Sequence, residues 1–188
     1  MIIGAIGAGM QNVMGRFSNW RRRLFSVRDQ ATNERLIREC AFFESFNESE
    51  AEYLARSCYL RQFKTEQLVY AEGSPSVAMY IVVEGSIGLY QKRRSGQTDR
   101  LLLLQPGKFF GDSCLYSDKD RQHSAKALEK SELLVLFKTD FDKISSEYPP
   151  VAIKLLKMVA LKLDHDLTVF QTEFHELAQK IAQNQLLQ

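Results

Sequence analysis

The residues best suited to chemistry lie between two strand-like runs, in residues 107–121. Phe110-Gly111-Asp112 places a glycine turn before a short acidic helical segment, and Arg121 follows nine residues after Asp112. A helix that begins between strands offers backbone N–H groups without intrahelical partners, and such groups bind anions. A nearby arginine adds a rigid fork of donors that suits a phosphate. This spacing predicts a phosphate-binding site.

Strand-like runs on both sides must position these residues. Residues 79–90 and 131–137 are rich in apolar residues, and from Phe63 to Phe137 short runs of this kind alternate with turn signals such as Ser95-Gly96. Short, regularly spaced strands are typical of an antiparallel barrel or jelly roll. We therefore predict a mainly β domain with flanking helices.

Two helical signals flank the predicted strands. Asn47 and Glu50 have the Asn-x-x-Glu form of a capping box, which predicts a helix that ends near Tyr59. After residue 148, apolar residues recur at alternating spacings of three and four, which predicts one long helix over residues 149–188.

The early turns of that long helix carry additional apolar residues, Val151, Leu155 and Val159, that suit packing on the barrel. Beyond Leu163 the apolar stripe narrows to a seam. A parallel coiled coil with a second copy would bury this seam, and a homodimer is the expected result. The alternative is that the N-terminal helix folds back onto it. The seam consists of Ile153, Leu156, Ala160, Leu163, Leu167, Phe170, Phe174, Leu177 and Ile181.

The first 30 residues form a distinct segment, predicted to be an amphipathic basic helix. Its apolar residues recur at helical spacing, and residues 1–28 contain five arginines and no acidic residue. Three alternatives remain open for this segment. It packs on this protein's own core or dimer, it contacts an anionic membrane surface peripherally, or it is a disordered tail. The arginines are Arg16, Arg21, Arg22, Arg23 and Arg28.

The rest of the chain has no excess of positive charge. The chain has 25 basic and 23 acidic residues, so 20 basic and 23 acidic residues remain after position 28. This balance argues against a broad nucleic-acid-binding surface. Because the chain stops at Gln188, we also expect no DNA-binding domain after the long helix. Three scattered cysteines, Cys40, Cys58 and Cys114, suit buried reduced thiols in a cytoplasmic protein.

The sequence predicts neither an enzyme nor a metal site. His123, His165 and His175 lack the spacing of metal ligands, and no nucleophile elbow or phosphate-binding P-loop is present. We expect no catalytic residue, no bound metal and no cofactor.

Residues 35–165 resemble the cyclic-nucleotide-binding domain of the catabolite activator protein, kinase regulatory subunits and nucleotide-gated channels. The family signature is Phe-Gly-Glu followed by an arginine nine or ten residues later, and here Phe110-Gly111-Asp112 and Arg121 match it. This resemblance implies a jelly-roll β-barrel in residues 31–148. Further matching anchors are Tyr70-Ala-Glu-Gly73, Tyr80-Ile81, Glu84-Gly85-Ser86 and Leu104-Gln-Pro-Gly107.

The resemblance also implies roles for individual residues. Arg121 would form an ion pair with the phosphate of a cyclic nucleotide, and Asp112 would accept a hydrogen bond from the ribose 2′-OH. Cyclic AMP is the first candidate for this ligand and cyclic GMP the second. Backbone amides would come from Gly111, Ser113, Cys114 and Gln122. The expected function is that of a small cytoplasmic sensor or adaptor, which signals through a dimeric C-terminal helix to a protein partner that the sequence does not identify.

Three departures from the family pattern keep other readings open. Asp112 is one methylene shorter than the usual Glu, Asp118 and Asp120 lie close enough in sequence to pair with Arg121, and Gln122-His123 replaces smaller residues. The alternatives are a different ligand, such as a cyclic dinucleotide, and a cassette that binds no ligand and acts as a dimeric scaffold.

Overall fold

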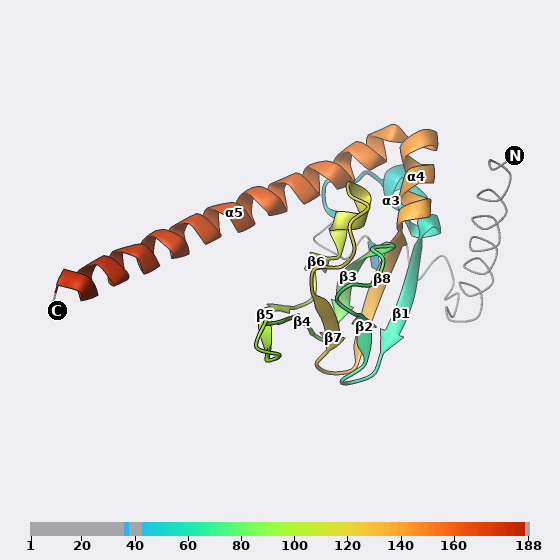
Figure 1. Ribbon diagram of the computed structural model, residues 1–188. Coiled ribbons are helices and arrows are strands. Elements are labelled where there is room, and N and C mark those ends of the chain that lie inside the picture. The colour runs from blue at the N-terminus through green and yellow to red at the C-terminus, as the bar shows by residue number, and fades with distance from the viewer. Residues whose placement is uncertain (1–35, 38–42, 187–188) are drawn as a thin grey trace, which may run out of the picture. The chain divides into compact units, whose positions relative to one another are not determined.

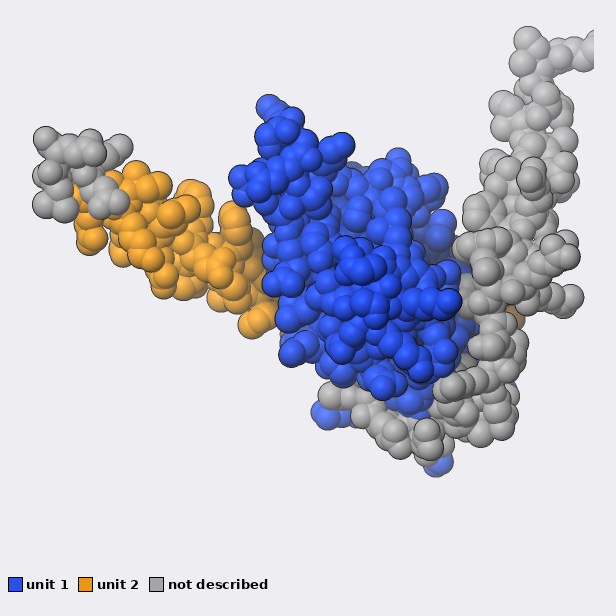
Figure 2. Space-filling view, turned by 90° about the horizontal axis from the view of Figure 1, so that it is seen from below, with its two compact units in different colours: residues 1–142 blue, residues 143–188 orange. Residues whose placement is uncertain are grey.

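The computed structural model describes residues 36–37 and 43–186, in two compact units, residues 1–142 and 143–188 (Figures 1 and 2). The helix predicted for residues 1–30 lies outside the described residues. Helix α4 crosses the boundary between the units. The described elements are α3 (Glu48–Ser57), β1 (Cys58–Phe63), β2 (Leu68–Tyr70), β3 (Ala78–Glu84), β4 (Ile87–Lys92), β5 (Thr98–Leu104), β6 (Phe109–Phe110), the 3-10 helix η2 (Asp112–Leu115), β7 (Ser124–Ala127), β8 (Ser131–Phe137), α4 (Lys138–Glu147) and α5 (Pro149–Leu186).

Helix α3 begins at the predicted capping box. The N–H of Glu50 donates to Oδ1 of Asn47 at 3.0 Å, and the N–H of Asn47 donates to Oε2 of Glu50 at 2.8 Å. The helix ends at Ser57, two residues before the predicted end near Tyr59, because β1 begins at Cys58. From Cys58 to Phe63 the chain pairs residue by residue with β8, and this pairing takes precedence over continued helix.

Eight strands form two antiparallel sheets in the described part of the first unit (Figure 1). The strand orders are β1-β8-β3-β6 and β2-β7-β4-β5. Both sheets contribute buried side chains to one core, including Phe63, Tyr80 and Val135 from the first sheet and Ile87 and Ala125 from the second. The predicted fold, antiparallel sheets with flanking helices and a long C-terminal helix, is confirmed.

The predicted hairpin tip at Ser95-Gly96 is also confirmed. Strands β4 and β5 pair from Ile87↔Leu104 to Lys92↔Thr98, and Gly96 adopts a left-handed conformation with φ of 88°. A left-handed residue in a tight turn favours glycine, which has no Cβ.

Helix α5 forms the larger part of the second unit, and its early apolar residues differ from its seam. Val151, Leu155 and Val159 are buried. The seam side chains are exposed, with 55% exposure at Leu167 and 62% at Phe170. No helix among the described residues combines the length and the hydrophobicity needed to cross a bilayer.

Candidate functional site

The turn between β6 and η2 requires a glycine at position 111. Gly111 has a left-handed backbone with φ of 72°. A Cβ at this position would lie 2.7 Å from Nη1 of Arg121 and 3.1 Å from the carbonyl oxygen of Ala78. The short helical segment that follows is a single 3-10 turn, and its first residue, Asp112, is buried.

The segment just before β7 places Arg121 and His123 against Tyr70 of the second sheet. Alternation along the strand buries Ala125, which is the register partner of Tyr70 in β2. His123 and Arg121 precede Ala125 by two and four residues, and both side chains contact Tyr70. The side chain of Gln122 is exposed instead. Period-two alternation therefore continues from the strand into the preceding turn.

Backbone groups of other residues hold both the guanidinium and the main chain of Arg121. Its Nη1 donates to the carbonyl of Gly111 at 2.9 Å, and its Nη2 donates to the carbonyl of Ala78. Its own N–H donates to the carbonyl of Ser74 at 2.9 Å, and its carbonyl accepts from the N–H of Gly73 at 2.8 Å. Only 4% of Arg121 is exposed, and its buried Nε has no hydrogen-bond partner among the described residues.

Aromatic rings surround the guanidinium. The Cζ atom of Arg121 lies 4.2 Å from the ring centroid of Tyr70 and 5.9 Å from that of Tyr80. The rings of Tyr80 and Phe110 stack with centroids 5.2 Å apart. Burial raises the pKa of both tyrosine hydroxyls, and the charge of Arg121 acts in the opposite direction. The site is therefore a buried cation in contact with aromatic faces.

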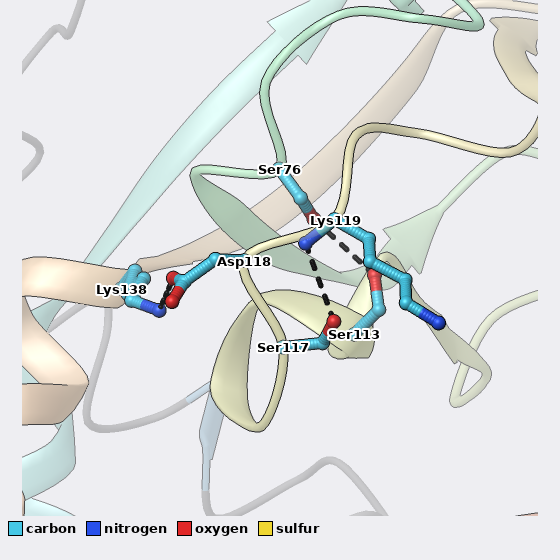
Figure 3. Close-up of polar contacts among 6 residues, drawn as sticks. All are labelled: Ser76, Ser113, Ser117, Asp118, Lys119 and Lys138. Atoms are coloured by element: carbon cyan, nitrogen blue, oxygen red, sulfur yellow. Dashed lines mark hydrogen bonds and ion pairs between the residues drawn. The ribbon is translucent and has the colours of Figure 1, made fainter.

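The aspartates that precede Arg121 do not neutralise it. Asp118 accepts a hydrogen bond from Nζ of Lys138 instead (Figure 3). The backbone carbonyl of Asp120 accepts from the side chain of Gln122 at 2.9 Å. Because the hydrogen bonds of the Arg121 side chain go to backbone carbonyls, the expected competition from Asp118 and Asp120 is not seen.

The structure places the six predicted site residues in different environments. Gly111, Asp112, Cys114 and Arg121 are buried in the same region, and burial raises the pKa of the Cys114 thiol to about 12. Ser113 is half-buried, and its hydroxyl lies 3.2 Å from that of Ser76 (Figure 3). The side chain of Gln122 is exposed and donates to the backbone carbonyl of Asp120.

Sequence reasoning missed the aromatic environment of Arg121. Tyr70 lies 51 positions before Arg121 in the sequence and reaches it through the pairing of β2 with β7. Tyr70 also forms a hydrogen bond with His123, with 2.9 Å between Oη and Nε2. The two-residue spacing of Arg121, His123 and Ala125 is the signal that could have indicated a shared face.

Comparisons with known proteins agree with this geometry. The family model described as "Cyclic nucleotide-binding domain" matches residues 60–148. The cyclic AMP receptor protein of Thermus thermophilus is 33% identical over 115 residues, which cover 61% of this chain and 53% of the receptor. A cyclic nucleotide-gated potassium channel of Mesorhizobium japonicum is 27% identical over 163 residues, 83% of this chain and 44% of the channel. The chain thus spans about half the length of these curated relatives.

A solved structure extends the likeness to the fold. A cyclic nucleotide-binding domain from Methylobacillus flagellatus superposes with a TM-score of 0.65 at 15% identity, over 74% of this chain and 80% of that chain. The region that the family model matches contains most of β1, strands β2 to β8, the Gly111 turn and Arg121. Residues 60–148 of this chain therefore belong to the cyclic nucleotide-binding domain family.

Proposed function

We propose that this domain binds a cyclic mononucleotide, with cyclic AMP as the first candidate, and acts as a non-enzymatic sensor. The observation that carries the proposal is the state of Arg121. It is a buried cation whose side chain donates to carbonyls and whose Nε has no acceptor among the described residues. Burying a cation is costly when one of its N–H groups has no acceptor, and an anionic ligand offsets that cost.

The proposed roles follow from the site geometry and the family resemblance. Arg121 pairs the phosphate, and backbone amides of Gly111, Ser113, Cys114 and Gln122 add donors. Asp112 is buried, its charge and that of Arg121 both act on Tyr70 and Cys114, and it accepts a hydrogen bond from the ribose 2′-OH. The relatives support the ligand class, since one is named a cyclic AMP receptor and another a cyclic nucleotide-gated channel.

The second unit supplies the proposed output. The exposed seam of α5, with Leu167 and Phe170 more than half exposed, is suited to pairing with a second copy. We propose that a homodimer presents this helix to a downstream protein. The signal that the homodimer passes on is the binding of a cyclic nucleotide to the first unit.

A second candidate function, a dimeric scaffold that binds no ligand, is favoured by one specific observation. Two backbone carbonyls and the Tyr70 ring already contact the guanidinium, so Arg121 stabilises the barrel without a ligand. In this case Arg121 joins β3 to the η2 turn and has no role in signalling.

Isothermal titration calorimetry separates the two functions. We expect saturable binding of cyclic AMP to the wild-type protein, with cyclic GMP and a cyclic dinucleotide as comparators. Arg121→Ala is expected to abolish binding, because the phosphate loses its guanidinium partner. Arg100→Ala removes an exposed arginine of β5 and serves as the matched control. Folded wild-type protein that binds none of the three ligands would leave the scaffold as the function.

A further inference from the structure

The guanidinium of Arg121 is enclosed by this protein's own atoms. The carbonyl oxygens of Gly111 and Ala78 accept from its Nη1 and Nη2. The Tyr70 ring lies 4.2 Å from Cζ, and Nε is buried. A phosphate needs direct contact with the N–H groups of an arginine to form charge-assisted hydrogen bonds. At least one enclosing group must therefore move before a phosphate reaches Arg121.

Tyr70 is the group best able to move. The carbonyl of Ala78 belongs to β3, an inner strand paired with both β8 and β6, and Gly111 lies in a turn fixed by its left-handed backbone. Tyr70 instead ends β2, a three-residue strand at the edge of the second sheet, with a register irregularity between Leu68 and Tyr70. An edge strand with irregular pairing opens at a lower free-energy cost than an inner strand.

His123 fixes the free end of the Tyr70 side chain. The register of β2 with β7 places Tyr70 opposite Ala125, and His123 is the next residue on the same face. Oη of Tyr70 lies 2.9 Å from Nε2 of His123, and the two ring centroids are 5.9 Å apart. The ring of Tyr70 contacts the cation of Arg121 and the rings of Tyr80 and Phe110. Its hydroxyl is held by His123.

We propose that the Tyr70–His123 hydrogen bond keeps the site closed and that its strength sets the affinity for the cyclic nucleotide. The inference rests on the function proposed above. Ligand binding requires Tyr70 to leave the guanidinium, and each binding event therefore includes the free energy of breaking this hydrogen bond. His123 is a positioning residue that acts through Tyr70 and makes no contact with the ligand in this scheme.

The proposal is tested by calorimetry, in which cyclic AMP is titrated into the wild-type chain and into four variants of it. Tyr70→Phe removes only the hydroxyl, and His123→Phe keeps a ring without a hydrogen-bonding atom. Both are expected to bind about two- to tenfold more tightly than wild type, the factor that corresponds to one net hydrogen bond. The Tyr70→Phe/His123→Phe double variant is expected to bind no more tightly than either single variant, because both remove the same interaction.

The matched control is His123→Gln, whose side-chain amide keeps a hydrogen-bonding group for Tyr70 and is expected to restore an affinity near that of wild type. If the wild type binds cyclic AMP and Tyr70→Phe and His123→Phe bind it equally or more weakly, the closure mechanism is overturned and the proposed function stands. Absence of binding in the wild type and in every folded variant would overturn both. A purely structural hydrogen bond would lower stability without a gain in affinity.

Discussion

Gly111 and Arg121 constrain each other, and this makes position 111 unusually sensitive. An alanine there must adopt a φ of 72°, which costs about 1–2 kcal/mol for an L-residue. Its Cβ would also lie 2.7 Å from Nη1 of Arg121. We expect Gly111→Ala to lower the free energy of unfolding by more than the backbone cost alone, as measured by urea denaturation.

Gly96→Ala is the control for that measurement. Gly96 has a comparable φ of 88°, but nothing lies within 4 Å of a Cβ placed there. It should therefore show the backbone cost without the steric one. Equal losses of stability in the two variants would mean that Arg121 is free to move away from Gly111.

The buried thiols predict a loss of stability in alkaline solution. Burial raises the pKa of Cys58 and of Cys114 from 9.0 to about 12. A pKa that is higher in the folded state stabilises the fold below pH 9, and that contribution is lost as the pH rises from 9 toward 12. Each thiol lowers the free energy of unfolding by up to about 1.4 kcal/mol per pH unit in this range.

Urea denaturation at pH 8, 9 and 10 measures this slope. Cys114→Ala is expected to make the decline shallower by the contribution of one thiol, because the protein then has one fewer group that must ionise on unfolding. An unchanged slope in this variant would show that the pKa of Cys114 is the same in the folded and unfolded states.

Whole elements were predictable where the signal was local. The Asn47-x-x-Glu50 spacing located the start of α3, and Ser95-Gly96 located the β4–β5 turn, because both depend on residues within a few positions. The seam spacing likewise gave the extent of α5. The start of β1 was missed because its pairing partner, β8, lies more than 70 positions away at Cys58↔Leu136.

The contacts of Arg121 show why the site was only partly predictable. Its presence near Gly111 follows from the sequence spacing of the family signature. Its contacts with Ala78 and Tyr70 come from sheet register and were not visible in any local pattern. For the same reason Asp118, although close in sequence, pairs with Lys138 in space.

The seam of α5 leads to a prediction about assembly. Leu167→Asp or Phe170→Asp places a charge within the predicted contact of two helices, where desolvation and repulsion between copies oppose association. We expect either variant to show the mass of one chain in light scattering, whereas wild type shows two. Thr172→Asp, also on the exposed part of α5 but outside the seam, should remain dimeric. An unchanged dimer mass in Leu167→Asp would contradict the seam.

The contacts of Arg121 and the seam of α5 belong to different units. All described contacts of Arg121 lie in the first unit, and the exposed seam lies in the second. We therefore expect one cyclic nucleotide per chain in calorimetry and an unchanged dimer mass in Arg121→Ala. A dimer that binds a single nucleotide, or dissociates when Arg121 is removed, would contradict this expectation.

The double backbone bond between Arg121 and the Gly73-Ser74 turn has a practical consequence for engineering. These bonds fix Arg121 independently of the preceding turn, while the N–H of Ser117 is anchored to the carbonyl of Ser113 at 2.8 Å. Between these anchors, residues 118–120 are exposed. A circularly permuted fluorescent reporter inserted there would be attached next to the guanidinium without replacing any group that holds it, which makes this turn the place to build an optical indicator from the domain.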